Sequence, residues 1–96
     1  MGGKRDPDEV FAAIGGDPVA SVVKPADRIH NLQSMVGVFD AAKMRSYIAE
    51  TEKHFLPMLR RSRRLFVDQE PAYENAKWLM VSQLELLECV LAGTPR

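Results

Sequence analysis

The sequence predicts an all-α fold, in the form of a small bundle of four to five helices. Apolar residues recur at spacings of three and four along most of the chain, and no stretch shows the strict alternation that is typical of a strand. Prolines that follow an acidic residue stand where several of these patterns begin, which is typical of helix starts. The length of 96 residues suits one domain. We expect a disordered start at 1–5, a single helical domain at 6–93 and a tail at 94–96.

Two helices are predicted in the first third of the chain. The first begins at Asp6-Pro7, where the aspartate can cap the helix and the proline suits its first turn, and it should end at Gly15-Gly16. Asp17-Pro18 repeats the start signal and opens a longer helix that should continue to about Val36. Pro25 lies inside this helix and lacks an N–H, so a kink is expected there.

Three more helices are predicted after residue 40. Asp40 is a suitable cap for a helix over 41–55, and its apolar residues repeat at helical spacing. Pro57 should break or kink that helix, and a fourth helix should cover 57–66. A last helix is expected over about 72–92, because a proline precedes it and a glycine follows it.

The last predicted helix is apolar around more than half of its circumference. A helix of this kind needs more than one neighbour to cover its apolar side chains. We therefore expect Trp78 to pack in the core. Cys89 stands in the middle of the same apolar pattern, and we expect its thiol to be buried and inert because nothing nearby positions a base for it.

Four polar side chains share one face of the second predicted helix. They are Lys24, Asp27, Arg28 and Asn31, at positions i, i+3, i+4 and i+7. Two cations and an amide on one face can hold a phosphate and read the edge of a base or ribose. The alternative is a solvated face on which Asp27 forms an ion pair with Lys24 or Arg28. All four are candidate ligand-binding residues.

One segment resembles the last motif of the HD superfamily of metal-dependent phosphohydrolases. It runs from Lys24 to Leu32 and reads K-x-A-D-R-x-H-N-L. The similarity is greatest to the hydrolase domain of the RelA/SpoT alarmone enzymes and their small phage and bacterial relatives. It continues through Tyr47–Thr51 and Phe55–Leu59, which look like that family's E-T-x(4)-A-P-L segment. The resemblance implies that Asp27 closes a metal site and that Asn31 contacts a nucleotide.

Most metal ligands of that family have no counterpart in this sequence. The family holds its metal with a His, an adjacent His-Asp pair and a final Asp, whereas the 23 residues before Lys24 contain no His. The acidic pair that activates water in the alarmone hydrolases is also missing. One carboxylate, from Asp27, cannot hold a divalent ion without several more ligands. The chain thus resembles the C-terminal half of an HD domain, for which we expect no catalytic residue and no metal site.

A basic run lies in the fourth predicted helix, at Arg60–Arg64. It wraps most of the way round the helix, so the simplest interpretation is a solvated face with bridges to nearby glutamates. The alternative is contact with an anionic ligand, in which Arg60 and Arg64 join the binding residues. No aromatic stacking residue interrupts the run, which argues against nucleic acid as a partner. Tyr47 is expected in the core and at the rim of the ligand pocket.

Composition narrows the partners and the compartment. The 13 basic side chains balance 13 acidic ones, so no overall field steers the chain onto nucleic acid or a membrane. A single cysteine allows no intramolecular disulfide, which fits a reducing compartment. No apolar run approaches the roughly 20 residues of a membrane-spanning helix, and no signal-peptide core follows the first residues. We expect a cytoplasmic protein, located in the host cytoplasm if a phage encodes it.

These features predict a protein that binds a small phosphorylated, nucleotide-type molecule without catalysis. By analogy, a phage protein that sequesters defence or alarmone nucleotides fits this description. No cofactor is expected. Apolar surface on the central and last helices should drive the formation of a homo-oligomer. Two alternatives stay open: a metal-dependent, alarmone-type phosphohydrolase fragment with a divalent metal at Asp27, and a protein-binding inhibitor that uses its apolar last helix.

Overall fold

The computed structural model describes residues 6–93. The start predicted to be disordered at 1–5 and the tail predicted at 94–96 lie outside the described residues. Between residues 6 and 93 the chain is helical and contains no strand, which confirms the all-α prediction. Within the same range, no helix is both long and apolar enough to cross a lipid bilayer.

Five α-helices occupy most of the described chain, together with two irregular helical segments. The elements in order are α1 (Pro7–Gly15), α2 (Ala20–Ser34), α3 (Ala41–Glu50), the π-helical turn η1 (Thr51–Phe55), α4 (Leu56–Leu65), the 3-10 turn η2 (Val67–Gln69) and α5 (Glu70–Ala92). The predicted helices begin and end within a few residues of these bounds. The exception is the helix predicted over 41–55, which divides into α3 and η1.

Aspartate side chains lie at or just before the starts of three helices: Asp6 and Asp40 are the N-caps of α1 and α3, and Asp17 lies two residues before the N-cap of α2. The carboxylates of Asp6, Asp17 and Asp40 each accept hydrogen bonds from backbone amides two or three residues further on, at 2.8 to 3.0 Å. The amides of Ala20 and Val19, in that order of importance, lower the pKa of Asp17 below its ordinary value of 3.8. Because the pKa falls on folding, this cap contributes its full stability above pH 3.8 and loses it as the pH drops through the lowered pKa.

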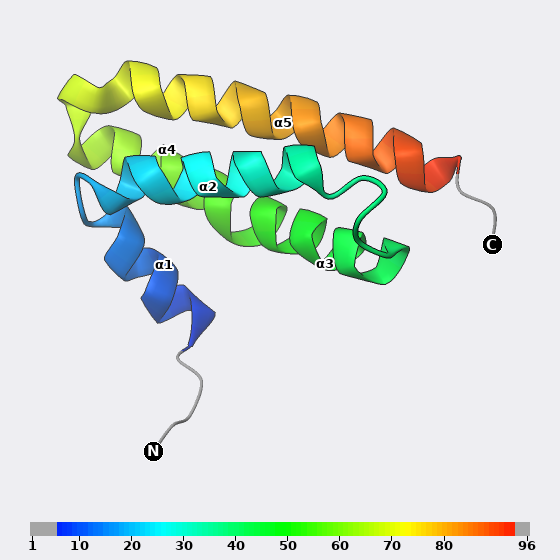
Figure 1. Cartoon of the computed structure of the whole chain (residues 1–96). Coiled ribbons are helices and arrows are strands. Elements are labelled where there is room, and N and C mark those ends of the chain that lie inside the picture. The colour runs from blue at the N-terminus through cyan, green and yellow to red at the C-terminus, as the bar shows by residue number, and fades with distance from the viewer. Residues whose placement is uncertain (1–5, 94–96) are drawn as a thin grey trace.

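Two helices of the bundle run parallel to each other, and a longer helical segment runs antiparallel to both. Figure 1 shows α2 and α5 lying side by side and running in the same direction. The segment α3–η1–α4 forms a rod that runs in the opposite direction along them. Helix α1 packs against α2, η1 and α4. As a result, α2 is held by three different elements, α1, α4 and α5.

Pro57 does not break the helix that precedes it. The chain stays helical from Ala41 to Leu65, and the irregularity appears as the π-helical turn η1 just before the proline. In η1 the Leu56 N–H bonds to the carbonyl of Thr51, five residues earlier, so the hydrogen-bond ladder shifts where Pro57 lacks a donor. Of the break or kink predicted at Pro57, the break does not occur, and the irregularity is the π-helical turn η1. Helix α2 likewise continues through Pro25, whose ring is buried.

Buried apolar side chains form two clusters that divide the bundle along its length. One cluster lies under α1, and its members are Phe11, Ile29, Phe55, Met58, Leu59, Tyr73 and Met80. The other lies between α2, α3 and α5, and its members are Leu32, Met35, Met44, Ile48, Leu84 and Leu87. Leu56 packs against both clusters, so they meet at the first residue of α4. Every long helix contributes to at least one of them.

Two predictions about α5 are wrong. The side chains of Trp78 and Cys89 are exposed, not buried. The buried face of α5 consists of Tyr73, Met80, Leu84 and Leu87, which lie on the opposite side of the helix. Helical periodicity shows that α5 has two apolar faces, but the described elements cover only one of them.

Gly15 ends α1 at a point where no side chain fits. A Cβ built on Gly15 lies 2.9 Å from Cγ of Met58 and 3.3 Å from Oγ of Ser62, and both of those side chains are completely buried. The Ser62 hydroxyl also donates to the Gly15 carbonyl at 2.9 Å. This contact requires the α1 terminus and α4 to stay close together.

Replacing Gly15 with alanine should therefore destabilise the fold. We expect the free energy of unfolding to fall by about 1 to 2 kcal/mol, because overpacking outweighs the gain in helix propensity. Chemical denaturation monitored by circular dichroism measures this change. Gly93→Ala is the matched control, since its Cβ meets nothing closer than 3.6 Å. Equal stability of the two variants would show that the α1–α4 contact is loose.

Candidate functional site

The candidate stripe on α2 divides into three exposed side chains and one that is mostly buried. Lys24, Asp27 and Asn31 are exposed. Arg28 lies among them in the sequence pattern, but only 12% of its side chain is accessible. Three residues of the stripe therefore face solvent, whereas the side chain of Arg28 packs against other side chains. Only the exposed three are free to meet a ligand without rearrangement.

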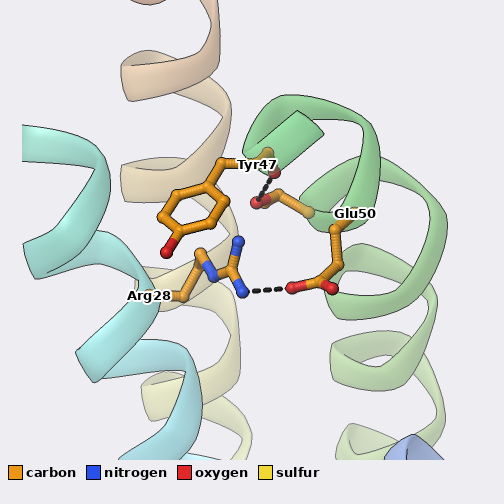
Figure 2. Close-up of polar contacts among 4 residues, drawn as sticks. Arg28, Tyr47 and Glu50 are labelled. Atoms are coloured by element: carbon orange, nitrogen blue, oxygen red, sulfur yellow. Dashed lines mark hydrogen bonds and ion pairs between the residues drawn. The ribbon is translucent and has the colours of Figure 1, made fainter. Parts of the chain in front are cut away.

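The guanidinium of Arg28 lies between two aromatic rings and a carboxylate. Its Cζ is 4.6 Å from the ring centre of Tyr47 and 4.8 Å from that of Phe55. Its Nη2 pairs with Oε1 of Glu50 (Figure 2). Ring faces attract a guanidinium, and partial exclusion of water strengthens both the ring contacts and the ion pair. Arg28 therefore ties α2 to α3 and η1.

The partner of Arg28 differs from the predicted one. The sequence favours an ion pair between Asp27 and either Lys24 or Arg28, but within residues 6–93 neither cation pairs with Asp27. Glu50 instead accepts from Arg28 across the gap between two helices. The prediction fails because spacing along one helix carries no information about a carboxylate 22 residues away.

One donor of Arg28 is unsatisfied. Its Nη1 is buried and has no hydrogen-bond acceptor among the described residues. An unpaired buried donor is costly, although contact with aromatic ring faces recovers part of the loss. This guanidinium keeps its position because two aromatic rings and a carboxylate surround it. It also retains an N–H that an additional acceptor could use.

Tyr47 connects the stripe to the α3 helix. Its ring is half-buried, covers the Arg28 guanidinium and meets the ring of Phe39 edge-on, with 5.6 Å between ring centres. Figure 2 shows its hydroxyl directed past the guanidinium toward α2. The Tyr47 carbonyl accepts a hydrogen bond from the Thr51 hydroxyl at 2.7 Å, which supports the start of the π-helical turn.

Glu50 and Phe55 contact Arg28 but are not among the site residues that the sequence predicts. Both belong to the two later segments that look like the E-T-x(4)-A-P-L region, and in the structure they surround an arginine from the first segment. The three sequence segments that carry the resemblance therefore lie together in space. The sequence pattern that could have identified Glu50 and Phe55 was therefore the resemblance itself, but it indicated a packing contact rather than contact with a ligand.

The basic run on α4 lies apart from the α2 stripe. Arg63 pairs with Glu74 and lies 3.8 Å from a carboxylate oxygen of Glu70, as the bridging interpretation predicts. Arg60 lines a groove of about 130 Å³ between α4 and α5, and no α2 residue lines that groove. Arg64 is exposed on α4 and pairs with no acidic residue between 6 and 93. The structure thus does not bring Arg60 to the stripe.

The residues around Asp27 do not form a ligand set for a divalent ion. Among residues 6–93, no group of three or more His, Cys, Asp or Glu side chains is placed to hold a metal. Asp27 itself is exposed, and a hard divalent cation needs several oxygen ligands in addition to one carboxylate. Asp27 and the residues around it therefore do not fit the divalent metal that the HD resemblance implies.

Comparisons with protein-family models, with curated proteins and with solved structures gave no match to this chain.

Proposed function

We propose that this chain is an HD-derived helical protein that binds a small phosphorylated, nucleotide-type molecule without hydrolysing it. The binding surface is the exposed side of α2 formed by Lys24, Asp27 and Asn31. Arg28 and Tyr47 form the edge of this surface against α3. The role is sequestration or sensing of the nucleotide. Such nucleotides occur in the cytoplasm, which is also where a free thiol such as that of Cys89 stays reduced.

The observation that carries the proposal is the fixed position of Arg28. Two rings and Glu50 hold the guanidinium, so the turn of α2 around it cannot rotate relative to α3 and η1. Lys24 lies one turn before Arg28 and Asn31 nearly one turn after it, and both project from this anchored segment. Groups held in place before a ligand arrives lose little entropy on binding. The anchor therefore favours recognition by the exposed neighbours.

The chemistry of the exposed residues suits the two ends of a nucleotide. Lys24 and Asn31 are separated by about 10 Å along the helix axis, a length comparable with that from a phosphate to a base. The ammonium of Lys24 pairs with a phosphate, and the amide of Asn31 can donate and accept at a base edge. Asp27 lies between them and repels phosphate, so it favours contact with a ribose hydroxyl. This order places the phosphate at the Lys24 end.

Isothermal titration calorimetry tests the proposal. The intact chain is titrated with pyrophosphate and with linear, cyclic and alarmone-type guanosine and adenosine nucleotides. We expect saturable binding of at least one nucleotide, and we expect the affinity to weaken as salt is added because a charge pair contributes.

Two variants locate the binding surface. Lys24→Ala should weaken binding by about tenfold or more, since a hydrogen bond to a charged group contributes roughly 1.5 to 3 kcal/mol. Lys53→Ala is the matched control, because Lys53 is an exposed lysine that lines a different hollow, beside α1. Absence of binding by every nucleotide, with the protein shown to be folded by circular dichroism, would remove the proposal. Equal losses in the two variants would remove the assigned surface.

A further inference from the structure

The outer face of α5 carries large apolar side chains that no described element covers. Trp78 is 61% exposed and Leu86 is 54% exposed, and Leu79 beside them is also exposed. Figure 1 shows α5 lying along one edge of the bundle, with α2 and α4 on its inner side. An exposed tryptophan among aliphatic side chains is uncommon on a monomer surface and is typical of interface centres. This face is accordingly a candidate for contact with protein.

The residues along this face are spaced symmetrically. Asn75, Trp78, Ser82, Leu86 and Cys89 follow one another at intervals of three, four, four and three. These intervals keep all five on one side of a helix. Ser82 is the midpoint, and its small side chain permits another helix to approach closely. Intervals that are the same in both directions from the midpoint suit a two-fold axis through that midpoint.

We propose that a second copy of this chain packs on this face, with the two α5 helices antiparallel and crossing at Ser82. This self-association goes beyond the proposed nucleotide binding and uses a different helix. In this arrangement Trp78 lies against Leu86 of the second copy, and Asn75 lies against Cys89 of the second copy. Each contact occurs twice. The paired helices, each about 34 Å long, present the full stripe to one another.

The charges beside the stripe favour this arrangement. Glu85 lies at one edge of it and Lys77 lies farther round the helix on the same side, and neither has an ion-pair partner between residues 6 and 93. The ammonium of Lys77 is 5.1 Å from the ring centre of Trp78, so it lies at the rim of the apolar patch. An antiparallel two-fold brings Glu85 of the second copy to the same side of the contact as the Lys77 ammonium. Both copies then gain opposite-charge contacts at the rim.

A parallel pair would not have this complementarity. The edge of the stripe that carries Glu85 would then face the other edge of the second copy's stripe. Lys77 would meet the other edge of the stripe, which carries apolar Leu79 instead of a carboxylate. The charge pattern therefore selects the antiparallel orientation.

Sedimentation equilibrium over a wide range of protein concentration tests the association. The full chain should form a dimer, and Trp78→Glu should weaken the dimer about 30-fold or more, as expected for an interface centre. Leu65→Glu is the matched control, because Leu65 is a similarly exposed apolar side chain, at 64%, on α4. Circular dichroism checks that both variants are folded. A monomer at all concentrations, or a dimer that Trp78→Glu leaves intact, would overturn the proposal.

Cysteine cross-linking tests the orientation. In the antiparallel dimer the two native Cys89 thiols lie about 21 Å apart along the helix axis, so mild oxidation should not join them. The variant Asn75→Cys places a new thiol opposite Cys89 of the second copy and should give a covalent dimer readily. Oxidation of the unaltered chain to a disulfide dimer at comparable rate would instead indicate a parallel pair and would contradict the proposed geometry.

Charge reversal gives an independent check on the same contact. Lys77→Glu and Glu85→Lys should each weaken the dimer several-fold, since each places like charges together at the rim. The double variant restores opposite charges across the two-fold and should recover most of the affinity. If the losses of the two single variants simply add in the double variant, Lys77 does not pair with Glu85 of the second copy.

Discussion

Alanine in place of Arg28 should lower the free energy of unfolding by about 2 to 4 kcal/mol, because the change removes a largely buried stem, two ring contacts and an ion pair. Figure 2 shows how closely the guanidinium fits between Tyr47 and Glu50. The loss should appear as a lower denaturation midpoint, monitored by circular dichroism at a fixed protein concentration.

A neighbour on the same helix supplies the control for this measurement. Lys24→Ala removes an exposed cation about one helical turn before Arg28, and it should change stability by no more than about 0.5 kcal/mol. If the two variants were equally stable, Arg28 would have to be a solvated side chain like Lys24. The anchor that supports the proposed binding surface would then not exist.

Leu32→Ala should destabilise the fold by about 3 to 4 kcal/mol, since the change leaves a cavity at a fully buried position. Leu32 has no exposed surface and packs in the cluster between α2, α3 and α5. Three helices meet at this side chain, so little collapse can fill the space. Leu65→Ala is the comparison, because the same truncation at an exposed position should cost about 0.5 kcal/mol or less. Similar midpoints for the two variants would contradict the described core.

The helix starts could be predicted from the sequence because they depend on local contacts. Asp6, Asp17 and Asp40 bond to amides two or three residues away, so the sequence alone contains both partners. The π-helical turn at Thr51–Phe55 could not be predicted in this way. It combines the missing donor of Pro57 with the burial of residues on both sides, and burial depends on the whole bundle.

The candidate site was predicted in part. Spacing along α2 identified the stripe correctly as one helix face, but it did not show that Arg28 turns inward while Lys24 and Asn31 stay exposed. The partner of Arg28 is Glu50, on another helix. The separation of Arg60 from the stripe has the same origin, because only tertiary packing decides which groove an α4 side chain faces.

The apolar pattern of α5 had two possible explanations that periodicity could not separate. Either several elements surround the helix, or one of its apolar faces stays exposed in the single chain. The exposure of Trp78 and Cys89 supports the second explanation. The proposed dimer then covers this face, and it does so without involving the α2 stripe.

The two proposals can fail separately. Trp78→Glu should leave nucleotide affinity unchanged if binding takes place on α2, and Lys24→Ala should leave the dimer unchanged if association takes place through α5. Measuring both quantities on both variants assigns each loss to one surface. Loss of both functions in one variant would indicate that the two surfaces are coupled.

Amide chemical-shift mapping by NMR tests the central claim most directly. The uniformly labelled chain is titrated with the nucleotide that gives the largest heat in calorimetry. We predict the largest shifts at Lys24, Asp27 and Asn31, with smaller ones at Tyr47 on α3. Shifts confined to the α4–α5 groove around Arg60, or no shifts with any nucleotide, would contradict the claim that the anchored face of α2 is the binding surface.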